Sequence, residues 1–258
     1  MEHQANTTPE AVPRRRWFIV LLILLGLAGI VIALLIPAVQ AARGAAQRMT
    51  CCGRMNQLQL AFQNYHDTHG SFPPAYTVDE NGKPLHSWRV LLLPYFYKQE
   101  LYDKIRLDEP WDSEFNRQFH AIQIEPYQCP ARRSTSSPRL RSVFVRDRDL
   151  LHMANCDYSV VIGEDTIFPG SKAVALDDVT HDPSNTILVV ERMIPINWMD
   201  PNNEIRFEAA REGINRNLLG IGSEHPGGAI VSFASGRGYL FLSDDIDIEP
   251  LLTKSAGD

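Results

Sequence analysis

The longest apolar stretch of the chain runs from Trp17 to Ile36, twenty residues without one charged side chain. At about 1.5 Å of rise per residue, a helix of this length spans roughly 30 Å, which is the thickness of the hydrocarbon core of a bilayer. We therefore predict one transmembrane helix over these residues, with the lipid bilayer as its partner.

The helical pattern continues past Pro37, where polar residues enter the sequence. Apolar residues recur there every three or four positions, as on one face of an α-helix: Ala38, Ala42, Ala45, Met49, Cys52, Met55, Leu58, Phe62 and Tyr65. Gly70 ends the pattern and prolines follow it. We predict a single helix over residues 14–69, kinked at Pro37, whose second half packs against the residues that follow.

The rest of the chain carries signals for short helices, strands and turns. Ser87 is the predicted N-cap of a buried helix that Pro94 interrupts. β-branched and aromatic residues gather in the predicted strands 158–162, 186–191, 229–233 and 239–242, and a further short strand is predicted at 122–129. The turn residues from Ser235 to Gly238 predict a β-hairpin between the last two of the four.

Together these elements predict an α+β fold in which a long N-terminal transmembrane helix packs on a mainly antiparallel β-sheet head. The predicted organisation is a disordered cytoplasmic tail at 1–13, the transmembrane and pilin-like helix at 14–69, and an extracytoplasmic head at 70–258. Within the head, residues 132–148 are rich in Arg and Ser, lack an apolar period and are predicted as an exposed loop.

Charge is distributed unevenly along the chain. Residues 1–66 hold six Arg and two Glu, a net charge of +4, and the remaining 19 basic and 29 acidic residues give −10. An acidic head argues against a nucleic-acid partner, because phosphates need a concentrated positive surface.

The arginines beside the apolar run predict its orientation. Arg14, Arg15 and Arg16 before the run are matched in number by Arg43, Arg48 and Arg54 after it, so the positive-inside count is close to a tie. The first three adjoin the run directly, whereas Arg43 lies six residues past its end, and this adjacency breaks the tie. The positive-inside rule then places the N-terminus in the cytoplasm and the head outside the cytoplasmic membrane, in the periplasm. A cleaved secretory signal is the alternative interpretation of the same run.

The chain has four cysteines, an even number that permits disulfides in an exported domain. A bridge from Cys51 to Cys129 would tie the long helix to the head and contribute roughly 4 to 5 kcal/mol on the chain-entropy model. The alternative is four reduced, buried thiols. No C-x-x-C pair suggests a zinc site or a redox dithiol.

Residues with catalytic or metal-binding potential form no recognisable set. His66, Asp67 and His69 lie at a helix end without a predictable third ligand. Glu224 and His225 lack the G-x-S-x-G motif of a hydrolase. The sequence from His225 to Gly228 predicts a tight turn before a strand, with the imidazole bonded to backbone.

An acidic group near the C-terminus is the remaining candidate for a cation site. It comprises Asp244, Asp245, Asp247 and Glu249 and lacks the glycine-punctuated D-x-D-x-D-G pattern of a calcium loop. We predict a solvated acidic surface here. No metal, cofactor or catalytic residue is therefore predicted anywhere in the chain.

Several phrases occur in an order that resembles a known family. They are LLIPAVQAARGAAQRMTC (34–51), LAFQNYHDTHGSFPP (60–74), SWRVLLLPY (87–95), PWDS (110–113), CP (129–130), SNTILVVE (184–191) and HPGG (225–228). The chain resembles the planctomycete family of prepilin-like proteins of unknown function, which join a type IV pilin-like helix to a head ending in H-x9-D-G. The resemblance implies a pilin-type architecture.

The chain departs from the family pattern at two places. Arg15, Arg16 and Val20 stand where a pilin-like precursor has the Gly before its cleavage point, the methylated Phe and the assembly Glu. We therefore predict an anchor that is neither cleaved nor methylated. Nine residues after His225, Ser235-Gly236 replaces Asp-Gly, so a positive-φ glycine remains while the carboxylate is lost. This favours a structural hairpin.

These observations predict a non-enzymatic, single-span, pilin-like protein of the cell envelope that acts through protein partners or through self-association of its helix. One alternative is an anchored head that binds carbohydrate or another polymer with exposed Trp88, Trp111 and Trp198, although large aromatics mostly bury in a core. An anchored hydrolase is the third.

Overall fold

The computed structural model of the chain describes residues 14–133 and 155–255. The predicted tail at 1–13 and nearly all of the predicted loop at 132–148 lie outside the described residues. The chain divides into two compact units, residues 1–46 and 47–258.

Helix α1, Arg14–His69, is a single helix of 56 residues that continues through Pro37, as predicted. In the first unit, its large apolar side chains from Trp17 to Val39 are between 49% and 69% exposed. Within the described residues, it is the one helix long and apolar enough to cross a membrane.

The part of α1 in the second unit forms part of the core of that unit. Cys51, Met55, Leu58 and Phe62 are fully buried at spacings of four, three and four residues. Met49, which was predicted on this face, is 71% exposed, because six residues before Met55 correspond to about 120° around the helix. Gly70 ends the helix with φ +74°, and its N–H donates to the His66 carbonyl at 2.7 Å.

The main sheet has four antiparallel strands in the order β3-β5-β7-β8. They are β3 Cys156–Ser159, β5 Ile187–Ile196, β7 Gly228–Phe233 and β8 Tyr239–Ser243. The predicted hairpin is β7-β8, and the turn that joins its strands has positive φ at Gly236 and Gly238. Two short pairs complete the strands: β1 Tyr76–Val78 with β2 Pro84–Ser87, and, in parallel, β4 Val161–Ile162 with β6 Ile205–Arg206.

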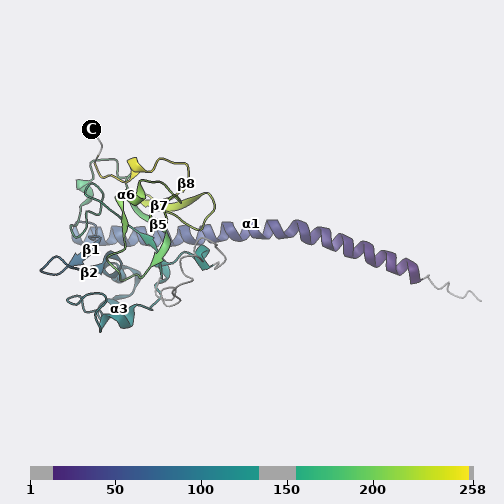
Figure 1. The fold of residues 1–258 in the computed structure, drawn as a ribbon, viewed down its shortest axis with the longest axis horizontal. Helices are drawn as coiled ribbons and strands as arrows, with labels where there is room; N and C mark the ends of the chain where they lie inside the picture. Colours follow the sequence, from purple (N-terminus) through teal and green to yellow (C-terminus); the bar gives the residue numbers. More distant parts are fainter. Residues whose placement is uncertain (1–13, 134–154, 256–258) are drawn as a thin grey trace, which may run out of the picture. The chain divides into compact units, whose positions relative to one another are not determined.

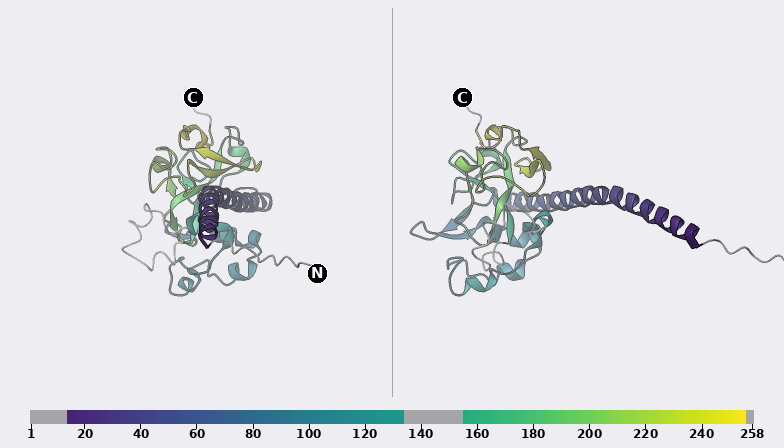
Figure 2. Two further views of the ribbon diagram at one scale, coloured as in Figure 1. Left: turned by 90° about the vertical axis from the view of Figure 1, so that its right-hand side faces the viewer. Right: turned by 45° about the vertical axis from the view of Figure 1, so that its right-hand side comes forward.

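Strands β3, β5 and β7 of the main sheet are buried on both faces, while the edge strand β8 is partly exposed. Along β7, Ile230 joins the core that contains the buried face of α1, while Val231 and Phe233 join a second apolar cluster with Ile248 and Leu252. The second half of α1 runs through the head, with β7 and β8 on one side and β1, β2 and α3 (Gln99–Tyr102) on the other (Figures 1 and 2). The predicted α+β class with a mainly antiparallel sheet is confirmed.

Two side-chain amides on α1 attach the helix to the end of β7. Gln59 Nε2 donates to the Phe233 carbonyl at 3.1 Å, and Gln63 Nε2 donates to the Ala234 carbonyl at 2.9 Å. Because these residues lie four positions apart, both amides project from the same side of α1. These two hydrogen bonds fix the position of α1 along its axis relative to the end of β7.

Short helical turns make up the remaining regular structure: α2 Trp88–Leu91, η1 Leu93–Phe96, η2 Asn116–Phe119, η3 Glu125–Tyr127, η4 Pro130–Arg133, η5 Leu176–Asp178, α6 Phe207–Ala210 and η6 Glu249–Leu251. Ser87 caps α2 as predicted, since its Oγ accepts from the Arg89 N–H at 3.3 Å. The predicted strand at 122–129 is wrong, because η3 occupies its centre. Pro126 has no N–H for a strand ladder and its fixed φ suits a 3₁₀ turn.

Candidate functional site

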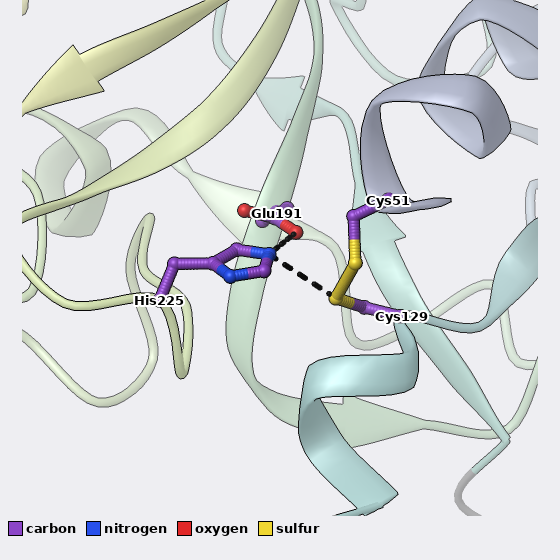
Figure 3. Close-up of side chains that lie close together, drawn as sticks. All are labelled: Cys51, Cys129, Glu191 and His225. Atoms are coloured by element: carbon purple, nitrogen blue, oxygen red, sulfur yellow. Dashed lines mark hydrogen bonds and ion pairs between the residues drawn. A yellow bond between two sulfur atoms is a disulfide. The ribbon is translucent and has the colours of Figure 1, made fainter. Parts of the chain in front are cut away.

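Four buried side chains meet between α1 and the main sheet (Figure 3). Cys51 comes from α1, Cys129 from the link between η3 and η4, Glu191 from β5, and His225 from the turn before β7. One sulfur, oxygen or nitrogen atom from each lies within 4.8 Å of the others. We refer to these four residues as the Cys–Glu–His centre.

A disulfide joins Cys51 to Cys129 and confirms the predicted bridge. Their Cα atoms lie 5.3 Å apart, within the usual range for a disulfide. The loop that it closes spans 78 residues, for which the chain-entropy model gives about 4.5 kcal/mol. Among the described residues, Cys52 and Cys156 are free cysteines.

Backbone and salt-bridge contacts position Cys129. Its N–H donates to Asp157 Oδ2 at 2.7 Å, and Asp157 Oδ1 pairs with Arg132 Nε at 2.5 Å. Burial raises the pKa of Asp157, while Arg132 opposes the increase. The carboxylate therefore holds the Cys129 backbone in place and is itself held by a cation.

Glu191 and His225 face each other across the centre. Glu191 Oε2 accepts from the Ile230 N–H at 2.8 Å, which directs Oε1 toward His225 Nε2 at 3.5 Å. The same nitrogen lies 3.5 Å from Cys129 Sγ. Both side chains are 2% exposed, so the pair lies in an environment from which solvent is excluded.

The predicted turn at His225 is present, and Nε2 of its imidazole faces the Glu191 carboxylate and the Cys129 sulfur. The Ser223 hydroxyl accepts from the His225 N–H at 3.0 Å and donates to the Gly228 carbonyl at 2.7 Å. Because this hydroxyl satisfies the backbone of the turn, the imidazole points inward to the carboxylate and the sulfur.

The glycines of the predicted motif have structural roles. Gly227 has φ +84°, and a Cβ on Gly228 would lie 2.0 Å from the Leu242 carbonyl oxygen. Gly236 has φ +72° and packs against the Gln63 side chain. The positive φ angles of Gly227 and Gly236 and the close approach at Gly228 agree with the prediction of a structural hairpin.

A second polar cluster, centred on Arg89 and Glu204, is fully buried. Arg89 Nη2 lies 3.2 Å from Glu204 Oε2, and the Ser159 hydroxyl donates to that oxygen at 2.6 Å. Burial alone would lower the pKa of Arg89, but Cys156 and Glu204 outweigh it and raise the pKa above its ordinary value. The cluster joins α2 to β3 and holds Arg89 charged.

The other histidine and acidic candidates have hydrogen-bonding, packing or salt-bridge roles. His66 Nε2 accepts from the Leu176 N–H at 3.1 Å, and the His69 ring stacks on Tyr65 with centroids 4.0 Å apart. In the C-terminal acidic group, Asp244 accepts from the Asn215 side chain at 2.7 Å, and Glu249 pairs with Arg211 at 2.9 Å.

The three tryptophans of the ligand-binding alternative do not form one exposed surface. Trp88 and Trp198 have no exposed area. Trp111 is half-buried and stacks on His120, with centroids 4.9 Å apart. The carbohydrate alternative therefore loses the exposed aromatic rings on which it depends.

Sequence reasoning missed Glu191 as a functional candidate. The residue ends the apolar run ILVVE, and a carboxylate in a strand that is otherwise buried was the available signal. Cys51, Cys129 and His225 were each singled out, but no spacing in the sequence brought them together. Only the fold places the four side chains in one centre.

The described residues thus form one membrane-length helix and a disulfide-bonded α+β head. The chain belongs to the family described as protein of unknown function (DUF1559), whose model matches residues 40–205. The matched residues include Cys51, Cys129 and Glu191, while His225 lies beyond them. No curated protein and no solved structure matches the chain.

Proposed function

We propose that the protein is a non-enzymatic, pilin-like membrane anchor that presents its head outside the cytoplasmic membrane and acts through protein association in the cell envelope. The observation that carries this proposal is the division of α1 into two surfaces. Its apolar side chains from Trp17 to Val39 are exposed, and its later turns form part of the head core. Such a helix is stabilised by burial of its apolar surface in lipid along its first half and in the head core along its second half.

The disulfide supports the proposed orientation. Structural disulfides persist in oxidising compartments and are rare in the cytosol. Together with the arginines at 14–16, Cys51–Cys129 favours a head on the outer side of the membrane. This is the periplasmic side if the envelope has two membranes.

A non-enzymatic role is supported by the oxidation state of the centre. His225 lies beside Cys129 Sγ, but a sulfur bonded to a second sulfur is not an acyl-transfer nucleophile, because the thiolate is the reactive form. The anchored hydrolase would need a different nucleophile within reach of His225.

The anchoring arm of the proposal is tested by membrane fractionation of the full chain. The unchanged protein should resist extraction at alkaline pH, and its mass should include the residues before Trp17. Leu27→Arg places a charge at the middle of the span, which costs about 2.5–3.5 kcal/mol on insertion scales, and should increase the extractable fraction. A mature protein that begins after Ile36 would identify a cleaved signal and refute the anchor.

The association arm is tested by photo-crosslinking in native membranes. A crosslinking residue at Met49 or Leu60, which are 71% and 59% exposed on α1, should give discrete adducts with a second copy or with another envelope protein. Exposed Glu80, in the turn between β1 and β2, provides the matched position. Equal adducts at Glu80 and at the two helix positions would contradict association through the helix.

A further inference from the structure

The Cys–Glu–His centre contains a buried oxygen without a hydrogen-bond donor. Glu191 Oε1 has no hydrogen-bond partner among the described residues, although Glu191 is 1% exposed. A buried carboxylate oxygen is costly to leave in this state. His225 Nε2 lies 3.5 Å from this oxygen, beyond a normal N–H···O distance.

Free space lies next to the centre. A cavity of ≈ 10 Å³ adjoins the centre, lined by Cys129 and Glu191 of the centre and by neighbours that include Arg132, Asp157 and Ser223; this is about the volume that one water-sized sphere needs. Figure 3 shows the imidazole, the carboxylate and both sulfurs converging from separate elements. Four donor atoms that lie within 4.8 Å of one another and come from separate elements have the geometry of an ion site.

We propose that reduction of the Cys51–Cys129 disulfide converts the Cys–Glu–His centre into a tetrahedral site for one Zn²⁺. The four ligands would be two thiolate sulfurs, His225 Nε2 and Glu191 Oε1. Thiolate, imidazole and carboxylate are the ligands that zinc takes in proteins, and two thiolates disfavour Mg²⁺ and Ca²⁺. Four protein ligands in a buried position correspond to a closed, structural type of site.

The conversion balances with a dithiol as reductant. The dithiol transfers two electrons and two protons, the Cys51–Cys129 bond breaks to give two thiols, and the reductant leaves as its own disulfide. Zn²⁺ then displaces one proton from each thiol. Two thiolates, one carboxylate, one neutral imidazole and Zn²⁺ sum to a charge of −1.

The backbone needs little change between the two states. Two thiolates on a tetrahedral zinc lie about 3.7 Å apart, given a Zn–S distance of about 2.3 Å. Cysteines with Cα atoms 5.3 Å apart reach this separation by rotation of their side chains. Glu191 Oε2 keeps its bond to the Ile230 N–H, which orients the ligand oxygen.

The test is metal titration of the full chain in detergent micelles, in the oxidised and the phosphine-reduced forms. Co²⁺ serves as the spectroscopic probe. The reduced protein should bind one Co²⁺ per chain with sulfur-to-cobalt charge-transfer bands and the visible bands of a tetrahedral site, and Zn²⁺ should displace it. The oxidised protein should give neither signal, and equal binding by both forms would overturn the proposal.

Variants separate the four ligands from their neighbours. Glu191→Gln and His225→Gln should weaken Co²⁺ binding on the order of tenfold or more, and Cys51→Ser should reduce the charge-transfer intensity. Cys52→Ser is the matched control, because Cys52 adjoins the centre on α1 without belonging to it, and should bind as the unchanged protein does. Loss of the bands in Cys52→Ser, or their full retention in Glu191→Gln and His225→Gln, would refute the ligand set.

Zinc X-ray absorption of the reduced, unchanged protein gives an answer that does not depend on the folding of any variant. The expected spectrum has two sulfur neighbours at about 2.3 Å and two nitrogen or oxygen neighbours at about 2.0–2.2 Å. A shell of oxygen and nitrogen alone would contradict the proposal. Because this site does not require the membrane anchor, its failure and that of the proposed function are distinguishable.

Discussion

At the scale of single residues, buried charge determines which positions of the head tolerate change. Arg89 and Glu204 have no solvent-exposed side-chain area, and Trp88 Nε1 also donates to Glu204 Oε1 at 3.1 Å. Removing one member of such a pair leaves the other as an uncompensated buried charge. The structure therefore predicts a larger effect from breaking the pair than from replacing both residues.

Glu204→Gln should lower the free energy of unfolding by about 3–5 kcal/mol. The amide retains the shape of the side chain but leaves Arg89 without its counter-charge. The measurement is denaturant unfolding followed by tryptophan fluorescence, since the Trp88 ring lies 4.4 Å from the Arg89 guanidinium carbon. The double variant Arg89→Met with Glu204→Leu should recover much of the loss, and a double variant no more stable than Glu204→Gln would contradict this account.

His86 makes stability depend on pH. Burial lowers its pKa below the ordinary value of 6.5, so below pH 6.5 the unfolded chain binds a proton that the folded protein resists. This effect destabilises the folded state by up to about 1.4 kcal/mol per pH unit, and above pH 6.5 it is absent. From pH 7 to pH 5, the unchanged protein should therefore lose stability relative to His86→Leu. A constant difference between the two proteins across this range would refute the assignment.

At the scale of elements, the sequence predicted well where a pattern is local. Period-3.6 apolarity identified α1, Ser87 identified the start of α2, and β-branched runs around Ser235–Gly238 identified the β7-β8 hairpin. Predictions failed where residues distant in the sequence determine which side chain is buried. Cys52 suited the apolar face of α1, but the disulfide to Cys129 holds the neighbouring Cys51 in the core instead.

The candidate site was predictable only as separate parts. Its residues lie at positions 51, 129, 191 and 225, and no helical or strand period relates such distant positions. The orientation of the His225 ring depends on the Ser223 hydroxyl, which takes over the backbone of the turn. Hydrogen bonds of this kind follow from the folded turn and leave no periodic signal.

Two glycines should respond oppositely to alanine because they lie in different elements. Gly228→Ala brings a methyl group against the Leu242 carbonyl and should destabilise the β7-β8 hairpin by about 1–3 kcal/mol. Gly53→Ala lies on α1, where the new Cβ would meet no atom within 4 Å beyond its chain neighbours and the local backbone of the helix, and should stabilise the protein by about 0.8–1 kcal/mol. Unfolding in denaturant measures the free energy of unfolding of each variant relative to the unchanged protein. Equal effects would show that the close approach at Gly228 does not constrain the hairpin.

At the scale of the whole molecule, one helix links two environments. The first unit offers apolar side chains without protein partners among the described residues, and the second buries the later turns of α1 in a disulfide-bonded core. The redox state of Cys51–Cys129 therefore reports on which side of the membrane the head lies. The number of thiols per chain that react with a labelling reagent therefore tests the proposed orientation.

Denatured under conditions that trap thiols, the unchanged protein should react with a maleimide polymer only at Cys52 and Cys156, because the other two sulfurs are bonded. Reduction before labelling should raise the count from two to all four cysteines. A variant with its flanking charges reversed should retain a larger share of heads in the cytosol, where the disulfide does not persist, and a fraction of its chains should label at four positions without reduction. The changes are Arg14→Ser, Arg15→Ser, Arg16→Ser, Gln40→Lys and Ala41→Lys. Four reactive thiols in the unchanged protein would place its head in a reducing compartment and contradict the orientation.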